Sequence, residues 1–438
     1  MDSQLTTKMS GHLVSENQVD LMREMFLTGL KAVSADVCLP AHIPDAVRGR
    51  TLILGVGKAG ATMARVAASR MEGLHNSIIL TRYGHGLHDH EAYPGTQLFE
   101  AGHPLPDTRG LEATRYILEE VGKLTCDDQL LMLISGGGSA LLTLPAPGIT
   151  LEDKKAVTRA LLACGASISE INCVRAHLSR IKGGRLGMAA SPAKIVTLAM
   201  SDIPGDDVAL IGSGPTVPCK TKLVDARKVL EMYRIPLSPS LHAALNDVRN
   251  ESPPVQPVQA EDASTRIVAR SRMALEAAGE LAHAAGYQPI YLGDGVEGDA
   301  SELGTVHAAL ALHYACKGGR YALLSGGETT VVVRNPAGRG GRNQEYLLNL
   351  ALGLNGASGI SALACDTDGI DGTEDNAGAF ITPDFLEIAQ ARGVSPRAAL
   401  NENRSYEFFR KMDSLIMTGP TRTNVNDMRI IMIDPANA

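Results

Sequence analysis

Apolar residues recur along the chain in short runs that are separated by amphipathic stretches. Residues 17–33 carry apolar side chains at helical spacing, which predicts an amphipathic helix ahead of the first strand. Strand-like apolar runs then alternate with helical patterns, an order typical of a mostly parallel sheet covered on both faces. The strands predicted in this half are 51–54, 77–81, 129–134 and 194–200, and the helices are 61–71 and 109–121.

A proline-rich segment interrupts this alternation, which then resumes. Residues 251–264 contain three prolines and show no periodicity, as linkers do. Because 438 residues exceed the usual size of one core, we expect two α/β domains, over 1–250 and 265–438. The elements predicted in the second half are helices at 271–285 and 300–315 and strands at 288–292, 322–324 and 360–365.

Composition and charge narrow the class of protein. The net charge of −7 gives no general electrostatic reason to bind nucleic acid or an anionic membrane. The first 18 residues lack the pattern of a signal peptide, and the chain has no apolar run long enough to span a bilayer. The seven cysteines contain no CxxC pair and are typical of reduced thiols. We therefore expect a soluble cytoplasmic protein, and a homodimer is compatible with the sequence.

The turn at 55–60, GVGKAG, follows a predicted strand and opens a predicted helix. Its GxGxxG spacing is typical of dinucleotide-binding folds and favours a dehydrogenase or reductase. Those folds also place a carboxylate at the end of the second strand, where this chain has Thr81 and Arg82. Arg82 would suit the extra phosphate of NADP, so an NAD(P)H-dependent reductase stays open as an alternative.

Lys58 lies inside that turn and favours a different chemistry. A lysine among backbone N–H groups at a helix N-terminus brings mobile positive charge beside a phosphate site. Phosphoryl transfer requires this arrangement and hydride transfer does not. A lysine exposed to solvent on a loop is the alternative interpretation.

A second glycine-rich segment, Ser135-Gly136-Gly137-Gly138-Ser139, also follows a predicted strand. Three successive glycines allow backbone N–H groups to converge on an anion without a Cβ in the way. We therefore predict a phosphate site here, with a tight turn as the alternative. The segment 325–327, Ser-Gly-Gly, follows another predicted strand and has the same pattern.

The segment 172–185 concentrates basic residues before and after a Gly-Gly pair. On a helix, Arg175, Ser179 and Lys182 would share one face that could receive a carboxylate or a phosphate. Arg185 follows the glycine pair. A solvated basic face is the alternative interpretation.

Acidic residues follow several of the predicted strands. Asp202 lies directly after the strand 194–200, Glu328 after the Ser-Gly-Gly of the second half, and Asp366 and Asp368 after the strand 360–365. The carboxyl ends of parallel strands are where α/β proteins place ligand groups, and Mg²⁺ takes one or two carboxylates together with substrate phosphates. The sequence therefore predicts a magnesium site that uses Glu328, Asp366 and Asp368.

Two arginines, Arg339 and Arg342, lie on the glycine-rich loop GRGGRNQE at 338–345, directly before a helix. Arginines that reach a transferring phosphoryl group stabilise its transition state. This loop therefore adds cationic residues to the predicted phosphate chemistry.

The motifs of the chain, taken together and in order, resemble those of the glycerate kinase family with a C-terminal MOFRL domain. They are GVGKAG, LISGGGSALL, INCVRAHLSRIKGGRL, SDIPGDD with IGSGPT, LLSGGETTV, GRGGRNQE and DTDGIDG. The resemblance covers residues 50–430. It implies a Rossmann-like N-terminal α/β domain, a MOFRL-type α/β domain and an active site in the interdomain cleft. It also implies that ATP and Mg²⁺ are used to phosphorylate D-glycerate, usually to 2-phosphoglycerate. Members of this family are also labelled hydroxypyruvate reductases, which is the alternative function.

The resemblance and the motifs together define the expected site. Lys58 and Arg342 match the family's motifs and are expected to be catalytic, and Asp202 is expected to act as the base. The expected nucleotide- and phosphate-binding residues are Gly55, Gly57, Ser135, Gly136, Gly137, Gly138, Ser139, Gly326, Gly327 and Arg339. The expected substrate-binding residues are Arg175, Lys182 and Arg185. Asn376 departs from the family pattern, in which a small residue is expected.

Overall fold

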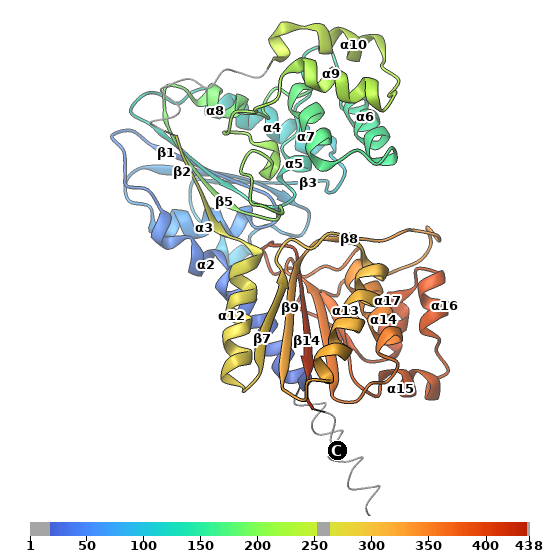
Figure 1. Ribbon diagram of the computed structural model, residues 1–438. Helices are drawn as coiled ribbons and strands as arrows, with labels where there is room; N and C mark the ends of the chain where they lie inside the picture. Colours follow the sequence, from blue (N-terminus) through green and yellow to red (C-terminus); the bar gives the residue numbers. More distant parts are fainter. Residues whose placement is uncertain (1–17, 252–262, 436–438) are drawn as a thin grey trace, which may run out of the picture. The chain divides into compact units, whose positions relative to one another are not determined.

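The computed structural model describes residues 18–251 and 263–435 (Figure 1). The chain divides into two compact units. The first unit is Ala35–Ala269, and the second combines Met1–Ser34 with Arg270–Ala438. Both are α/β, as predicted. None of the helices in the described part of the chain is both long and apolar enough to cross a membrane.

The first unit is built on a sheet of six parallel strands in the order β3-β2-β1-β4-β5-β6. This is the doubly wound order of nucleotide-binding folds, in which β1 and β4 are neighbours whose connections leave in opposite directions. The crevice at their carboxyl ends is therefore the expected ligand site. The strands are β1 (Thr51–Val56), β2 (His75–Arg82), β3 (Thr96–Ala101), β4 (Gln129–Ile134), β5 (Lys194–Met200) and β6 (Ala263–Ala269).

The central strands are buried along their whole length. Every residue of β1 and β4 is buried, which is why their sequences are continuous apolar runs instead of alternating ones. The edge strand β3 alternates less clearly, carries polar residues and was not predicted. The helices of this layer are α2 (Ala35–Cys38), α3 (Gly60–Arg70), α4 (Thr108–Val121), α5 (Gly138–Leu141) and α8 (Arg185–Ala190).

Four further helices of the first unit enclose a core of their own. They are α6 (Leu151–Ala163), α7 (Ile168–His177), α9 (Leu223–Met232) and α10 (Pro239–Asn246). Figure 1 shows them in green and yellow-green at one end of the sheet. Their side chains become important for the site because α6 and α7 carry buried cations.

The second unit contains a mixed six-stranded sheet in the order β13-β12-β11-β14-β9-β7. Only β7 and β9 are parallel, because β14 returns antiparallel between β9 and β11. Its strands are β7 (Gln288–Gly293), β9 (Tyr321–Gly327), β11 (Ile360–Asp366), β12 (Gly378–Ile381), β13 (Leu415–Ile416) and β14 (Asp427–Ile433), and β8 (Gly298–Asp299) pairs separately with β10 (Thr329–Thr330). Its helices after residue 270 are α12 (Ser271–Ala284), α13 (Ala300–Ala315), α14 (Arg342–Leu354), α15 (Phe385–Ala391), α16 (Pro396–Asn401) and α17 (Ser405–Lys411).

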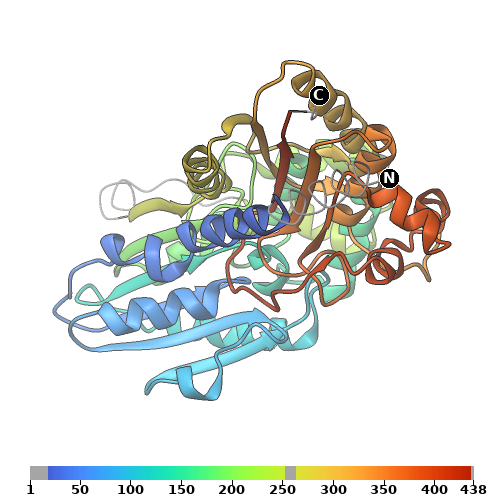
Figure 2. The ribbon, with the colours of Figure 1, turned by 90° about the horizontal axis from the view of Figure 1, so that it is seen from below.

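The division of the chain differs from the predicted domains at two places. The helix over 18–32 was expected in the N-terminal domain, but its apolar face is buried within the second unit. The Gln18 amide donates to the Asp434 carboxylate at 2.8 Å and accepts from the Ser361 hydroxyl at 2.6 Å. Figure 2 shows this helix, in dark blue, beside the orange and red strands.

The second difference concerns the segment just after the predicted linker. Residues 265–269 were expected to open the second domain and no strand was predicted there, yet they belong to β6, which pairs with β5 and completes the first sheet. Its backbone groups are thereby satisfied by the ladder of β5. Most of the predicted linker 251–264 lies outside the described residues.

Candidate active site

The turn after β1 and the loop after β4 are bonded to each other at the carboxyl edge of the first sheet. The Lys58 N–H donates to the Gly136 carbonyl at 2.9 Å, and the Ala59 N–H donates to the Ser135 hydroxyl at 3.0 Å. Gly57 has a φ of 108°, which a residue with a Cβ rarely adopts. The two predicted phosphate-binding turns are therefore one connected structure at the topological switch point of the sheet.

The N–H groups that remain for an anion lie in the middle of the second loop. None of the described residues accepts a hydrogen bond from the N–H of Gly136 or Gly137, and Gly137 has a φ of 84°. Gly55 has a different place: it lies inside β1, and a Cβ there would come within 2.3 Å of the Gly60 carbonyl oxygen. Gly55 thus allows α3 to pack closely, whereas Gly136 and Gly137 have N–H groups available for an anion, and their phosphate-binding role stays a prediction.

Replacing Gly57 by alanine is expected to lower the free energy of unfolding by about 2 to 5 kcal/mol, because backbone strain and a steric clash add. The new Cβ would lie 2.4 Å from the Ser135 hydroxyl oxygen. Gly84→Ala is the matched control, since Gly84 also has a positive φ, 76°, but a Cβ there would have no neighbouring atom within 4 Å. Urea denaturation should show a clearly larger loss of unfolding free energy for Gly57→Ala than for Gly84→Ala. Equal losses in the two variants would contradict the close approach of the two turns.

Lys58 lies in a strongly cationic environment. Its side chain reaches the space above Gly137, where a Cβ would be 3.5 Å from the Lys58 Cγ and 3.1 Å from the His103 ring. Burial lowers the pKa of His103 to about 3, and the positive charges of Lys58 and Arg82 act in the same direction. His103 is therefore neutral at physiological pH beside the lysine. Sequence reasoning missed it because it follows β3, the strand that was not predicted.

A second lysine, Lys182, is buried and forms hydrogen bonds to the end of the same loop. Its ammonium donates to the carbonyl of Ser139 at 2.7 Å and to that of Gly212 at 3.4 Å. The hydroxyls of Ser139 and Ser213 are 2.5 Å apart, and Ser213 donates to the Asn172 side chain at 3.1 Å. The segments SGGGS, IGSGPT and INCVRAHLSRIKGG, which are far apart in the chain, therefore meet at one place.

The structure corrects the predicted helical face. The helix α7 ends at His177, so Arg175, Ser179 and Lys182 do not lie on one helix. Ser179 instead forms an isolated β-bridge with Pro145, and its hydroxyl accepts from the Lys182 N–H at 3.3 Å. The turn continues through Gly183 and Gly184 with φ of 61° and 85°, a path that a helix cannot follow.

Arg185 was expected to bind substrate, and the structure gives it another set of partners. Its guanidinium donates to the carbonyls of Ala176, Lys182, Asn250 and Glu251 at 2.6 to 3.1 Å. All of these acceptors are backbone groups, so Arg185 fixes the chain around α7. Two of the carbonyls come from a segment 65 and 66 residues away, which the local pattern could not indicate, and the substrate-binding role of Arg185 stays a prediction.

Asp202, the predicted base, is half-buried directly after β5. This strand is next to β4 in the sheet, so the aspartate lies at the same carboxyl edge as the two glycine-rich turns. Its position is compatible with the predicted role, which stays a prediction.

In the second unit, three carboxylates surround Arg342, the first residue of α14. Its guanidinium contacts Asp427 at 2.9 Å, Asp366 at 2.7 Å and Glu328 at 3.4 Å. The carboxylates converge because β14 is antiparallel: its first residue, Asp427, is opposite Asp366, the last residue of β11. Burial opposes the charge, but these carboxylates raise the pKa of Arg342 above its ordinary value.

Two further aspartates hold this cluster together: Asp427, which sequence reasoning missed, and Asp371, which it noted only as one of three aspartates suited to Mg²⁺. Asp427 is fully buried and also accepts from Arg429 at 2.6 Å and from the Asn343 amide at 2.7 Å. Asp371 accepts from the N–H groups of Asn343 and Gln344, both at 3.1 Å, and so caps α14. Burial raises the pKa of Asp371 to about 7. The third aspartate of the DTDGIDG run thus positions the helix that carries Arg342.

The predicted metal ligands fit Mg²⁺ in part. Glu328, just after β9, and Asp366, at the end of β11, both contact the Arg342 guanidinium, so the two carboxylates lie on the same cation. Asp368 is buried and accepts from the Ile370 N–H at 2.8 Å. Within 18–251 and 263–435, no group of three or more His, Cys, Asp or Glu side chains has the arrangement of a metal cage. Mg²⁺ usually needs only one or two carboxylates beside phosphate oxygens, a role that Glu328 and Asp366 suit best.

Three other predicted phosphate-binding residues have local packing partners. Gly326 and Gly327 lie inside β9, where a Cβ would come within 2.0 Å of the Ser271 hydroxyl and 2.2 Å of the Val296 nitrogen, respectively. Arg339 forms an ion pair with Glu374, and its guanidinium lies 4.9 Å from the Tyr406 ring centre. These contacts explain why small residues and an arginine occur there without a bound phosphate.

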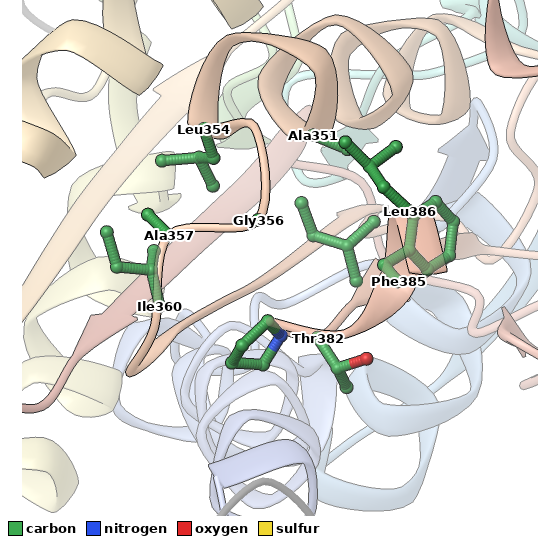
Figure 3. Close-up of a pocket in the computed structure, with 10 residues that line it drawn as sticks. Ala351, Leu354, Gly356, Ala357, Ile360, Thr382, Phe385 and Leu386 are labelled. Atoms are coloured by element: carbon green, nitrogen blue, oxygen red, sulfur yellow. The ribbon is translucent and has the colours of Figure 1, made fainter. Parts of the chain in front are cut away.

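A small apolar cavity in the second unit is separate from this chemistry (Figure 3). It has a volume of about 10 Å³, barely enough for one water molecule. Leu354, Phe385 and Leu386 line it together with other apolar side chains, and no charged group takes part. Exposed Gly356 and half-buried Thr382 and Pro383 complete its lining, so it is a small hollow at the margin of the core.

Family models and known proteins match both units of the chain. The model of DUF4147, described as a domain of unknown function, matches residues 21–246, and that of the MOFRL family matches residues 321–427. A D-glycerate 2-kinase of Thermotoga maritima is 36% identical over 95% of this chain and 99% of its own. A protein of Agrobacterium vitis with the provisional name hydroxypyruvate reductase is 46% identical over 97% of this chain and 96% of its own.

A solved structure agrees with these sequence relatives. The crystal structure of a glycerate kinase from Thermotoga maritima has a TM-score of 0.83 and 35% identity, and the match covers 95% of this chain and 100% of that one. The protein is accordingly an enzyme of the phosphotransferase class that acts on an alcohol group. It belongs to the glycerate kinase family with a C-terminal MOFRL domain, as the motifs predicted.

Proposed function

We propose that the protein transfers the γ-phosphoryl group of ATP to D-glycerate in the presence of Mg²⁺ and forms 2-phosphoglycerate. The observation that carries the proposal is the bond between the Lys58 turn and the Gly136 loop. It places a lysine beside two glycine N–H groups that no described residue accepts from. This arrangement suits a phosphate that changes charge during transfer.

The proposed chemistry needs no covalent intermediate on the protein. The glycerate hydroxyl oxygen attacks the γ-phosphorus, the bond to ADP breaks, and the hydroxyl proton passes to a base, for which Asp202 is the candidate. Lys58 and Arg342 would stabilise the charge on the transferring group. Mg²⁺, held by Glu328 and Asp366, would neutralise charge on the phosphates when bound. The seven cysteines, none of which forms a disulfide, suit an enzyme of the reducing cytoplasm.

A coupled assay tests both the reaction and its product. The purified protein with ATP, Mg²⁺ and D-glycerate should give phosphoenolpyruvate when enolase alone is added, because enolase accepts only 2-phosphoglycerate. A signal that appears only after phosphoglycerate mutase is added would show phosphorylation at the other hydroxyl. Absence of a signal in both assays would contradict the kinase proposal.

The alternative function is an NAD(P)H-dependent hydroxypyruvate reductase. The strand order of the first sheet and the GxGxxG turn favour it, since both are shared with dinucleotide-binding folds. Two observations oppose the reductase. The strand β2 ends at Arg82 without a carboxylate, and the Thr81 hydroxyl already donates to the Gly57 carbonyl at 2.9 Å. Oxidation of NADH or NADPH by hydroxypyruvate, with no ATP turnover, would establish the reductase instead.

A further inference from the structure

Lys154 is a buried cation for which the described residues supply no hydrogen-bond partner. It lies on α6 with 6% of its surface exposed, and its ammonium has no hydrogen-bond acceptor among the described residues. Burying an ammonium group without a partner is unfavourable. Burial and the charge of Arg175 lower the pKa of Lys154 to about 7. The position therefore costs stability unless another group, absent from the fold itself, compensates the charge.

Two further cations, Arg175 and Lys182, interact electrostatically with Lys154. Arg175 lies half-buried on α7, and burial lowers its pKa without a hydrogen-bond acceptor or carboxylate among the described residues to offset the effect. Lys182 is 1% exposed, and its ammonium donates to carbonyl and hydroxyl oxygens, with no carboxylate among these acceptors in the described residues. Burial lowers the pKa of Lys182, and Lys154 and Arg175 lower it further. The three positive charges thus repel one another.

The acidic residues near Lys154 on its own helix are occupied elsewhere. Asp153 accepts from the N–H and hydroxyl of Thr150 and so begins α6, and Glu152 pairs with Lys155 at 2.9 Å. Arg175 from α7 and Lys182 from the turn before α8 are the charged groups that couple to Lys154. The cluster is consequently a concentration of positive charge without an internal counterion among the described residues.

We infer that Lys154, Arg175 and Lys182 form an oxyanion site next to the Ser135–Ser139 loop, to which Lys182 is bonded through Ser139. A small oxyanion would give Lys154 and Arg175 the acceptors that they lack and would screen their repulsion. Given the proposed function, on which this step rests, the anion is either the carboxylate of the hydroxy acid or a phosphate of the nucleotide. Both present the same chemistry to the cluster. Lys154 extends the predicted pair of Arg175 and Lys182, and Arg185 is excluded from it.

Calorimetry on the full chain tests the site, with D-glycerate, ATP and inorganic phosphate each added alone. Lys154→Met should weaken binding of one of these anions at least tenfold. Lys155→Met is the matched control, because Lys155 is the next residue of α6 and pairs with Glu152 on the same helix. Its affinities should equal those of the wild type. A tenfold loss for D-glycerate alone identifies the carboxylate as the natural ligand, and a loss for ATP alone identifies the nucleotide.

Proton uptake gives a second readout that a packing role of Lys154 would not affect. An anion raises the pKa of Lys154 from about 7, so binding at pH 8 should take up protons from the buffer. The binding enthalpy should therefore depend on the ionisation enthalpy of the buffer, and less so in Lys154→Met. Unchanged affinities and unchanged proton uptake in the folded variant would overturn the inference.

The direction in which Lys154→Met changes the folding stability can also be predicted. Because the folded pKa of Lys154 lies below the unfolded value, its charge destabilises the native state most below pH 7, and this effect fades as the pH rises toward 10.5. Lys154→Met should therefore be at least as stable as the wild type at pH 7. If it does not fold, Arg175→Met and the charge-retaining Arg175→Lys provide the same comparison. A wild type that binds phosphate through this cluster but phosphorylates nothing would refute the proposed function and leave the oxyanion site supported.

Discussion

Lys58→Ala is expected to lower kcat by about 10²- to 10³-fold, the usual effect of removing one preorganised donor from a developing charge. Lys58 supplies the mobile charge of the turn after β1, whereas its backbone N–H, bonded to Gly136, is unchanged by the substitution. The structure of the turn should consequently survive. Steady-state kinetics in the coupled assay and a thermal melt of the same preparation measure the two effects separately.

Lys155→Ala provides the control for a lysine removed from the same unit. It takes away an ammonium that is half-buried and pairs with the exposed carboxylate of Glu152 on the same helix. Both kcat and the melting temperature should stay close to those of the wild type. A folded Lys58→Ala enzyme with the kcat of this control would remove Lys58 from the mechanism.

Arg342→Ala is expected to reduce both activity and stability. The loss in kcat should again be about 10²- to 10³-fold, because in the proposed mechanism Arg342 stabilises the charge on the transferring group. The free energy of unfolding should fall by about 3 kcal/mol, since breaking a buried ion pair leaves a carboxylate without its cation. Asp366 would be that carboxylate, whereas Asp427 retains Arg429. From the motif alone, we expected the effect on kcat to exceed by far any effect on folding, and the buried ion pairs change that expectation.

Arg404→Ala is a suitable control in the same unit. Arg404 is 54% exposed and contacts Glu402 at 3.3 Å, so its removal should change the stability by less than about 1 kcal/mol. Urea denaturation and kinetics on both variants would reveal the difference. An Arg342→Ala protein that is as stable as Arg404→Ala would contradict the buried cluster, and one with normal kcat would contradict the catalytic role.

Local patterns predicted much of the fold because the central strands are buried on both faces. The apolar runs of β1, β4, β5 and β11 identify them without knowledge of their neighbours. The antiparallel insertion of β14 could not be predicted in this way, because strand direction depends on partners that are far apart in the sequence. The same reason explains why the helix over 18–32 was assigned to the wrong half of the chain.

The candidate site residues that lie in local motifs could likewise be predicted, and those defined by distant partners could not. Lys58, the Ser135–Ser139 loop and Arg342 lie in motifs whose glycines and charges are visible in a single stretch of sequence. Lys154 and Asp427 lie in no such motif, and only burial distinguishes them from ordinary surface residues. Arg185 shows what such a motif leaves out, since a basic residue next to a glycine pair suggested a ligand, and the pattern gave no sign that backbone carbonyls far along the chain are its partners.

The assignment of residues 18–34 has a consequence for biosynthesis. The second unit is discontinuous: its first helix is made before the first unit and the rest of it afterwards. The first unit is complete once residue 269 has left the ribosome, and it can fold while the remainder is still being made. The helix over 18–32 must wait with its apolar face uncovered until β11 and β14 exist, because the partners of Gln18 come from residues 359–434. Each newly made chain therefore completes its second unit last, when the helix over 18–32 meets residues 359–434.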